Sequence, residues 1–294
     1  MNMRLFFYFC CVAQIASAQP LSVVLKPPYT GEGARATSQV AQSAAASASP
    51  DSSANVQTGT ADPGAVKAKQ LIDQMIQSLG GDAYLHFTDV TQEGRTNGFY
   101  HGTPSGGTAP FWRFYKFPDK ERVELTKQRD WIVIHNGERG TETTFHGTKP
   151  EDDDAHREYL LRDQYSMENV LRKWLNAPGT VLFYDGTGFT DNHQVENVTV
   201  ANAQNQQETF SIDEFTHLPV RKSYTVRDPK YKDKDTYADI YSEYRPIQGI
   251  QTPHVVTRMK NDEMTSQRFL SKVSYNQGLK DDLFVPPTSM SGRK

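Results

Sequence analysis

Apolar and polar residues alternate most regularly in the second half of the chain, between residues 208 and 275. Phe210 and Ile212 alternate there with polar neighbours, which is the period-two pattern of a strand with one buried face. An aspartate and a proline interrupt the run at residues 213–219, a composition that favours a chain reversal, and strand-like runs then resume. Because such short links cannot contain a parallel crossover, we expect these consecutive strands to pair antiparallel.

A second group of strand-like runs lies upstream. These runs cover residues 87–100, 111–117, 122–126, 131–135 and 140–145. Asn136-Gly137 separates the last two runs and is the dipeptide most typical of a two-residue hairpin. Two shorter runs, at residues 181–184 and 195–201, bring the expected number of strands to about eleven.

Helical periodicity marks a segment near residue 70. Asp62 is a predicted N-cap, Pro63 is the predicted first helical residue, and Gly80-Gly81 ends the pattern. The apolar residues that share one face of this helix are Ala68, Leu71, Ile72, Met75 and Leu79. A stripe of this kind is more often core packing than a ligand site.

A second helical region follows the acidic residues 151–154, which favour the positive end of a helix dipole. Its first apolar group occupies residues 159–161, and Ser166 is a candidate cap for the piece that follows. The amphipathic residues of that second piece are Met167, Val170, Leu171, Trp174 and Leu175. Pro178-Gly179 ends the region.

The first 62 residues differ in composition from the rest of the chain. Arg4, an apolar run at residues 5–13 and the small residues 16–18 predict a cleaved signal peptide over residues 1–18. The apolar run is far shorter than the roughly 20 residues that span a bilayer, so we expect no transmembrane span in the mature chain. Residues 19–62 are rich in Ala and Ser and predict a disordered linker, because they cannot bury enough apolar area to fold.

Both cysteines, Cys10 and Cys11, fall within the predicted signal peptide. The mature chain would therefore contain neither a disulfide nor a reactive thiol. A lipid-modified cysteine is an alternative that Tyr8-Phe9 disfavours, since small residues are expected at those positions. The remaining residues, 63–290, are expected to form one domain.

The order of these elements predicts the fold class. One helix, about five strands, a helical interruption and about six further strands predict an α+β protein with a large curled antiparallel sheet. A sheet this wide has to curl, which gives a half-open β-barrel of about 11 strands with helices covering the concave side. Space between the helices and the sheet would form an apolar pocket.

At four places the chain resembles the LolA/LolB-like superfamily, the periplasmic carriers and receptors of lipoproteins. Lys116-Phe117-Pro118-Asp119 resembles the Lys-x-Pro-Asn turn of the family, and Asn136-Gly137 resembles its Asp-Gly hairpin. Asp213 with Leu218-Pro219 is similar to a turn of many relatives, and residues 283–287 resemble the closing Phe-x-Pro-Pro motif. The resemblance spans residues 64–287 and implies a half-open barrel lidded by helices, with outer-membrane lipoprotein sorting as the related function.

One residue departs from the carrier pattern. In the lipoprotein carriers a basic residue directly precedes the turn proline and helps to lock the lid, whereas this chain has Phe117 there. Arg113 or Arg122 could lie nearby and replace it. Since a shared fold does not by itself imply a shared cargo, the resemblance leaves the ligand open.

Motifs for catalysis or metal binding do not occur in the sequence. There is no nucleophile elbow, phosphate loop, dinucleotide fingerprint or His-Glu-x-x-His pattern. The eight histidines are scattered singly, so a zinc site would need residues distant in the sequence to converge. His156 follows the aspartates 152–154, which we interpret as a solvated helix start. We therefore predict no catalytic residues, no metal ligands, no cofactor and no enzymatic activity.

The predicted ligand site is an apolar cavity between sheet and helices. Its predicted wall and lid residues are Trp112, Phe114, Trp131, Ile134, Met167, Leu171, Trp174, Phe210, Ile212 and Phe269. These aromatic and aliphatic side chains could enclose an acyl chain, and the alternative is that they form one collapsed core.

These observations predict a non-catalytic, monomeric protein, periplasmic or secreted, that binds a lipid or the acyl part of a lipoprotein. An alternative is that this chain uses the same fold as an envelope module that holds or senses another envelope protein. A hydrolase is a further alternative if His135 or His254 meets two carboxylates in a cleft. The formal net charge of −3 provides no basic excess for phosphates, so nucleic acid is not an expected partner.

Overall fold

The computed structural model describes residues 62–227 and 232–287. The predicted signal peptide (1–18) and the predicted linker up to residue 61 lie outside the described residues. Within the described ranges no helix is both long and apolar enough to cross a membrane.

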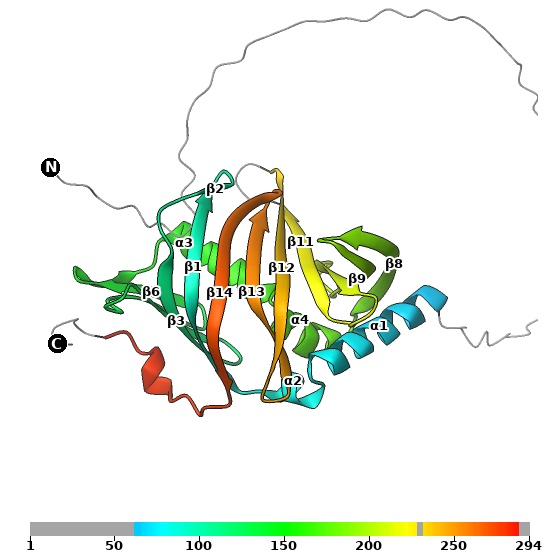
Figure 1. Ribbon diagram of the computed structural model, residues 1–294, viewed down its shortest axis with the longest axis horizontal. Coiled ribbons are helices and arrows are strands. Elements are labelled where there is room, and N and C mark those ends of the chain that lie inside the picture. The colour runs from blue at the N-terminus through cyan, green and yellow to red at the C-terminus, as the bar shows by residue number, and fades with distance from the viewer. Residues whose placement is uncertain (1–61, 228–231, 288–294) are drawn as a thin grey trace, which may run out of the picture. The chain divides into compact units, whose positions relative to one another are not determined.

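One antiparallel sheet of 14 strands dominates the structure (Figure 1). The strands are β1 (Asp89–Tyr100), β2 (Thr103–Pro104), β3 (Ala109–Lys116), β4 (Lys120–Leu125), β5 (Trp131–Asn136), β6 (Arg139–Thr144), β7 (Gly147–Pro150), β8 (Val181–Thr190), β9 (His193–Ala201), β10 (Gln207–Asp213), β11 (Pro219–Arg227), β12 (Lys234–Ile247), β13 (Ile250–Lys260) and β14 (Glu263–Tyr275). Their order is β7-β6-β5-β4-β3-β1-β14-β13-β12-β11-β10-β9-β8, with β2 paired to β1 alone. The sheet is curled but not closed, because β7 and β8 form its two edges.

The predicted α+β class and the antiparallel pairing are confirmed. The strand count differs slightly from the expected eleven because β2 and β7 are very short. β2 lies in a glycine-rich loop, and β7 carries no alternating apolar residues, so neither has the pattern from which a strand is predicted.

The helices are α1 (Pro63–Leu79), α2 (Asp82–His86), α3 (Asp153–Gln164) and α4 (Met167–Arg172), with 3₁₀ turns η1 (Trp174–Asn176) and η2 (Asp281–Phe284). In Figure 1, α3 and α4 lie behind the sheet. We call the face of the sheet that these helices cover the inner face, and the opposite face the outer face. The predicted caps are confirmed: the Asp62 side chain accepts from the Gly64 amide at the start of α1, and the Ser166 side chain accepts from the Asn169 amide at the start of α4.

The main core lies on the inner face. It joins the apolar side of α1, the residues of α4 and η1, and inward side chains of β1, β3, β9, β10, β13 and β14. A smaller core lies on the outer face, where Ile132 and Ile134 of β5 pack against Phe284 of η2. The C-terminal turn therefore covers the sheet on the side opposite to the long helices.

Candidate functional site

Six of the ten predicted ligand-site residues lie on the inner face. They are Trp131, Met167, Leu171, Trp174, Phe210 and Ile212. Leu171, Phe210 and Ile212 are almost completely buried, and Met167 and Trp174 are buried as well. Most of their apolar surface therefore already contacts the protein's own side chains, and only Trp131 is partly buried among the six.

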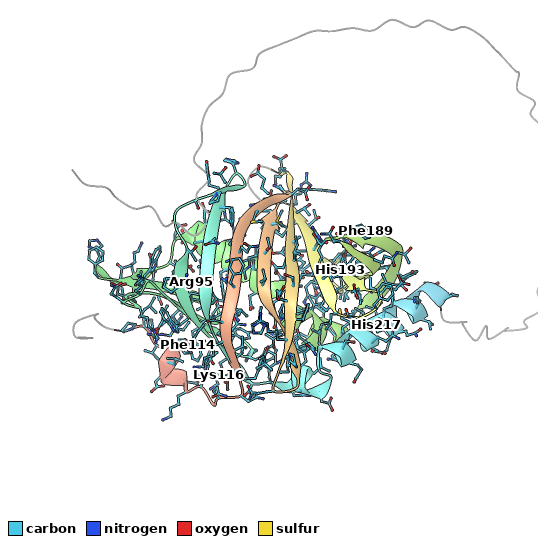
Figure 2. The ribbon with its side chains drawn as sticks, in the orientation of Figure 1. Arg95, Phe114, Lys116, Phe189, His193 and His217 are labelled. Atoms are coloured by element: carbon cyan, nitrogen blue, oxygen red, sulfur yellow. The ribbon has the colours of Figure 1, made fainter. Side chains whose placement is uncertain are left out.

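The other four predicted residues lie elsewhere. Phe114 and Ile134 belong to the outer core, and Figure 2 labels Phe114 on β3. Trp112 shares the face of Phe114, and the Arg129 guanidinium lies 4.8 Å from its ring centroid. Phe269 is 40% exposed. Six of the ten thus share the inner face, where five of them are buried in the core, and ligand binding by any of the ten stays a prediction.

The aromatic run at residues 111–115 explains why the sequence did not separate the two faces. Phe111 and Tyr115 are buried in the inner core, while Phe114 packs outward. Alternation identifies the buried face of a strand only when the other face is polar. Aromatic residues occupy both faces of β3, so the alternation does not show which face is the inner one.

Charged side chains occupy the inner face beside the apolar core. The Lys222 ammonium lies 3.3 Å from Glu208 and 3.4 Å from Asp239, and it donates to the Tyr165 carbonyl at the end of α3. Burial raises the pKa of Glu208 to about 8, although Lys222 opposes this change. Burial acts in the same direction on Asp239, but Lys222 and Arg258 hold the pKa of that carboxyl below its ordinary value.

Arginines extend this charged region across β3, β14 and β13. Arg113 pairs with Glu121, and Arg258 lies 3.6 Å from Asp239. Arg268 lies 5.6 Å from the Phe111 ring centroid, and among the described residues no carboxylate lies within ion-pairing distance of it. Burial lowers the pKa of Arg268 well below its ordinary value, and the neighbouring cations Arg258 and Arg113 lower it further.

These arginines are not sealed from solvent. The side chains of Arg113 and Arg258 remain 21% and 24% exposed, although they lie on the face that α3 covers. Of the two arginines considered as replacements for the basic residue of the carriers, Arg113 lies on the inner face. Arg122 lies on the outer side, where it pairs with Glu124 and donates to the Leu283 carbonyl. The inner face thus carries solvent-accessible arginine side chains next to an apolar core.

A histidine cluster lies where α3 begins. His135 of β5 places Nε2 2.8 Å from Glu151 Oε2 and Nδ1 3.6 Å from Glu121 Oε2, and its ring stacks on Tyr159 of α3. Burial lowers the pKa of His135, but the two glutamates outweigh burial and raise it. His135 does meet two carboxylates, and among the described residues no serine, threonine or cysteine side chain hydrogen-bonds to its ring.

A surface pocket of about 520 Å³ lies along α1. It is lined by Val66, Lys69, Gln70, Asp73, Gln74, Gln77, Ser78 and His217. These side chains come from the outward side of α1 and from the turn between β10 and β11, where Figure 2 labels His217. None of the predicted ligand residues lines this pocket.

Comparison with known proteins supports the fold. No protein-family model and no curated protein matches the chain. Among solved structures, a putative outer membrane lipoprotein-sorting protein domain from Vibrio parahaemolyticus aligns with 10% identity over 75% of this chain and 97% of that one, with a TM-score of 0.50.

Two further solved structures align over similar lengths. A DUF1329 family protein from Desulfovibrio piger has 13% identity over 74% of this chain and 97% of its own, with a TM-score of 0.49. A LolA superfamily protein from Nitrosomonas europaea has 10% identity over 74% of this chain and 97% of its own, with a TM-score of 0.46. The chain shares its fold with the lipoprotein-sorting protein domain from Vibrio parahaemolyticus, in agreement with the resemblance found in its sequence.

Proposed function

We propose that this protein is an exported, non-catalytic carrier-like protein that binds an amphipathic ligand, a lipid or the acylated part of a lipoprotein, on the inner face of its sheet. The LolA-like fold supports this proposal, since a solved structure with the same fold is described as a lipoprotein-sorting domain. At 10% identity that likeness concerns the fold, so the ligand has to be argued from the side chains.

The observation that carries the proposal is the unpaired cation on the inner face. Arg268 has no carboxylate partner among the described residues and lies beside Phe111, at the border of the apolar core. A phosphate or carboxylate head group would supply the missing anion through charge-assisted hydrogen bonds. The attached acyl chain would gain about 0.8 kcal/mol for each CH₂ group that it buries against the neighbouring aromatic residues.

Access to this face would require α3 to move. The predicted lid residues of α4 are buried in the core, whereas α3 buries a single side chain, Tyr159. Leu161 packs half-buried against the core, and several other contacts are polar, such as the 3.2 Å hydrogen bond from the Tyr237 hydroxyl to Glu158. Polar contacts can be exchanged for water at low cost, so we assign the lid function to α3 rather than to α4.

The proposal is tested on tag-free protein purified from an exporting host. Native mass spectrometry should find a co-purifying lipid, and after delipidation a lysolipid with an acidic head group should raise Tm more than one with a zwitterionic head group. Arg268→Gln should weaken binding of the acidic lysolipid at least fivefold, because it removes a charge-assisted contact. Arg95→Gln, on the outer face of the neighbouring strand, is the matched control.

Absence of a bound lipid together with no Tm change for either lysolipid would contradict the proposal. Equal loss in Arg268→Gln and Arg95→Gln would contradict the assigned binding face, because only Arg268 lies on the inner side.

A protein-interaction module is the second candidate, and the edge strand β8 favours it. Phe183 and Phe189 are 48% and 71% exposed on this strand, and β9 is its only strand partner among the described residues. An exposed edge with apolar side chains is a site at which an extended segment of another protein can add a strand. A photo-crosslinker at Phe189 that captures one defined envelope protein, while one at Phe145 on the far side of the sheet does not, would support this function.

A further inference from the structure

Three side chains with metal-binding atoms converge at the start of α3. His135 lies in β5, Glu151 directly follows β7, and His156 lies in the first turns of α3. Glu151 Oε2 is 2.8 Å from His135 Nε2 and 3.2 Å from His156 Nδ1. The metal-binding atoms of the three residues all lie within 4.8 Å of one another. The β6–β7 hairpin brings together residues that are separated by up to 21 positions in the sequence.

The outer ring nitrogens of both histidines face acceptors. His156 Nε2 lies 2.8 Å from the Glu138 carbonyl oxygen, which can only accept, so this nitrogen carries a hydrogen. His135 Nδ1 faces the Glu121 carboxylate at 3.6 Å. A histidine that binds a metal typically donates its other N–H to a carboxylate or a backbone carbonyl, which leaves the inner nitrogen free to bind the ion. His156 has this contact, whereas His135 Nδ1 is buried without a hydrogen bond and has the Glu121 carboxylate as its neighbour.

Without a metal ion, each inner nitrogen needs a hydrogen to bond to Glu151 Oε2. A neutral His156 ring, with its hydrogen on Nε2, points the Nδ1 lone pair at that oxygen, and two acceptors repel one another. One divalent cation between them replaces two protons with the same total charge. Imidazole nitrogen with one carboxylate oxygen is a ligand set that zinc commonly uses.

Gly140 leaves the space that this arrangement requires. A Cβ atom on residue 140 would lie 2.4 Å from His156 Nδ1 and 2.6 Å from Glu151 Oε2, both too close for real contacts. Gly140 is not among the glycines with a positive φ, so close approach rather than backbone conformation requires the glycine. β6 thus presents bare backbone to the two converging ligand atoms.

We propose that His135 Nε2, His156 Nδ1 and Glu151 bind one divalent transition-metal ion of the zinc class, with a fourth position left for water or another ligand. The ion would fix the first turns of α3 to β5 and so hold the helix on the inner face. Glu121 and the Glu138 carbonyl would act as positioning groups that orient the two rings. The site lies at the other end of α3 from Lys222, and zinc binding can be measured whether or not the lipid proposal holds.

The test uses the tag-free exported protein after treatment with a chelator. Competition with a chromophoric zinc indicator should show one tightly bound Zn²⁺ per chain. His156→Ala and Gly140→Ala should each weaken zinc binding at least tenfold, the first by removing a ligand and the second by crowding two of them. His146→Ala changes an exposed histidine in the β6–β7 turn and should bind zinc as the unaltered protein does.

Hydrogen exchange of the unaltered protein gives a readout that needs no variant. Zinc should slow exchange of the α3 amides and leave those of α1 unchanged. Failure of the unaltered protein to bind zinc overturns the proposal, and so does binding that Gly140→Ala and His156→Ala leave intact. If circular dichroism shows that either variant is unfolded, Glu121→Gln replaces it, with the same expected direction and a loss of about tenfold or more.

Discussion

Two groups of helices meet the same sheet in different ways. Helix α1 buries six apolar side chains, and the short α4 buries four residues, so both belong to the core. Helix α3 is twelve residues long and buries only Tyr159. Leu161 packs half-buried against the core, and many of the other contacts are hydrogen bonds and ion pairs, including Gln164 to Gln206 at 3.0 Å and the His156 cluster.

The difference assigns separate roles to the two groups. Burial of apolar side chains provides the main stabilisation of a fold, so α1 and α4 can leave the sheet only when the domain unfolds. A helix held by polar contacts can open locally, because water replaces those partners. The predictions below test whether α3 is such a locally opening element.

The largest expected effect is a core truncation in α4. Leu171→Ala should reduce the free energy of unfolding by about 2–5 kcal/mol, because Leu171 is fully enclosed by the core. Leu160→Ala, in a half-buried position of α3, is the matched control and should cost less than about 1 kcal/mol. Urea unfolding followed by tryptophan fluorescence measures both. Equal losses would mean that α3 is as much a part of the core as α4.

The second prediction concerns pH at the junction of α3 and α4. Burial raises the pKa of Glu208 to about 8 in the folded state, above its value in an unfolded chain. Its contribution to stability is therefore fully present in acid and is lost as the pH rises through about 8. We expect a decrease of about 3 kcal/mol between pH 5.5 and 8.5, smaller than the full shift implies because the rest of the change falls below pH 5.5.

Glu208→Gln isolates this contribution from the other titrating groups. Urea midpoints of the two proteins are compared at several pH values, and the variant should lose less stability than the unaltered protein as the pH rises. Parallel pH profiles would show that Glu208 is already ionised beside Lys222 at neutral pH.

The sequence predicted the sheet and its helices better than the inner surface. Alternation in β10 and the caps of α1 and α4 are local signals, and each was present in a few consecutive residues. The convergence of His135, Glu151 and His156 is not local, since it depends on how β7 returns the chain to β5. The side chain of Arg268 points to the inner face because the register between β1 and β14 shifts at Glu93/Gly94. The sequence contains no pattern from which this shift could be predicted.

The third prediction compares local opening directly. In metal-free protein the amides of α3 should exchange with solvent faster than those of α1 by at least about tenfold, because opening α3 exposes little apolar surface. Hydrogen exchange followed by mass spectrometry resolves peptides from the two helices. Equal protection in α1 and α3 would remove the physical basis for α3 as a lid.

The smallest expected effect comes from two helix caps of the same kind. Asp62 accepts from the Gly64 amide at α1, and Asp152 accepts from the Asp154 and Ala155 amides at α3. Replacing an N-cap aspartate by alanine costs about 1 kcal/mol. Asp62→Ala should lower the urea midpoint, because α1 unfolds together with the domain. Asp152→Ala should leave that midpoint nearly unchanged and speed exchange of the α3 amides about fivefold, because its cost falls on local opening. A lowered midpoint in both variants would mean that the two helices unfold as one unit.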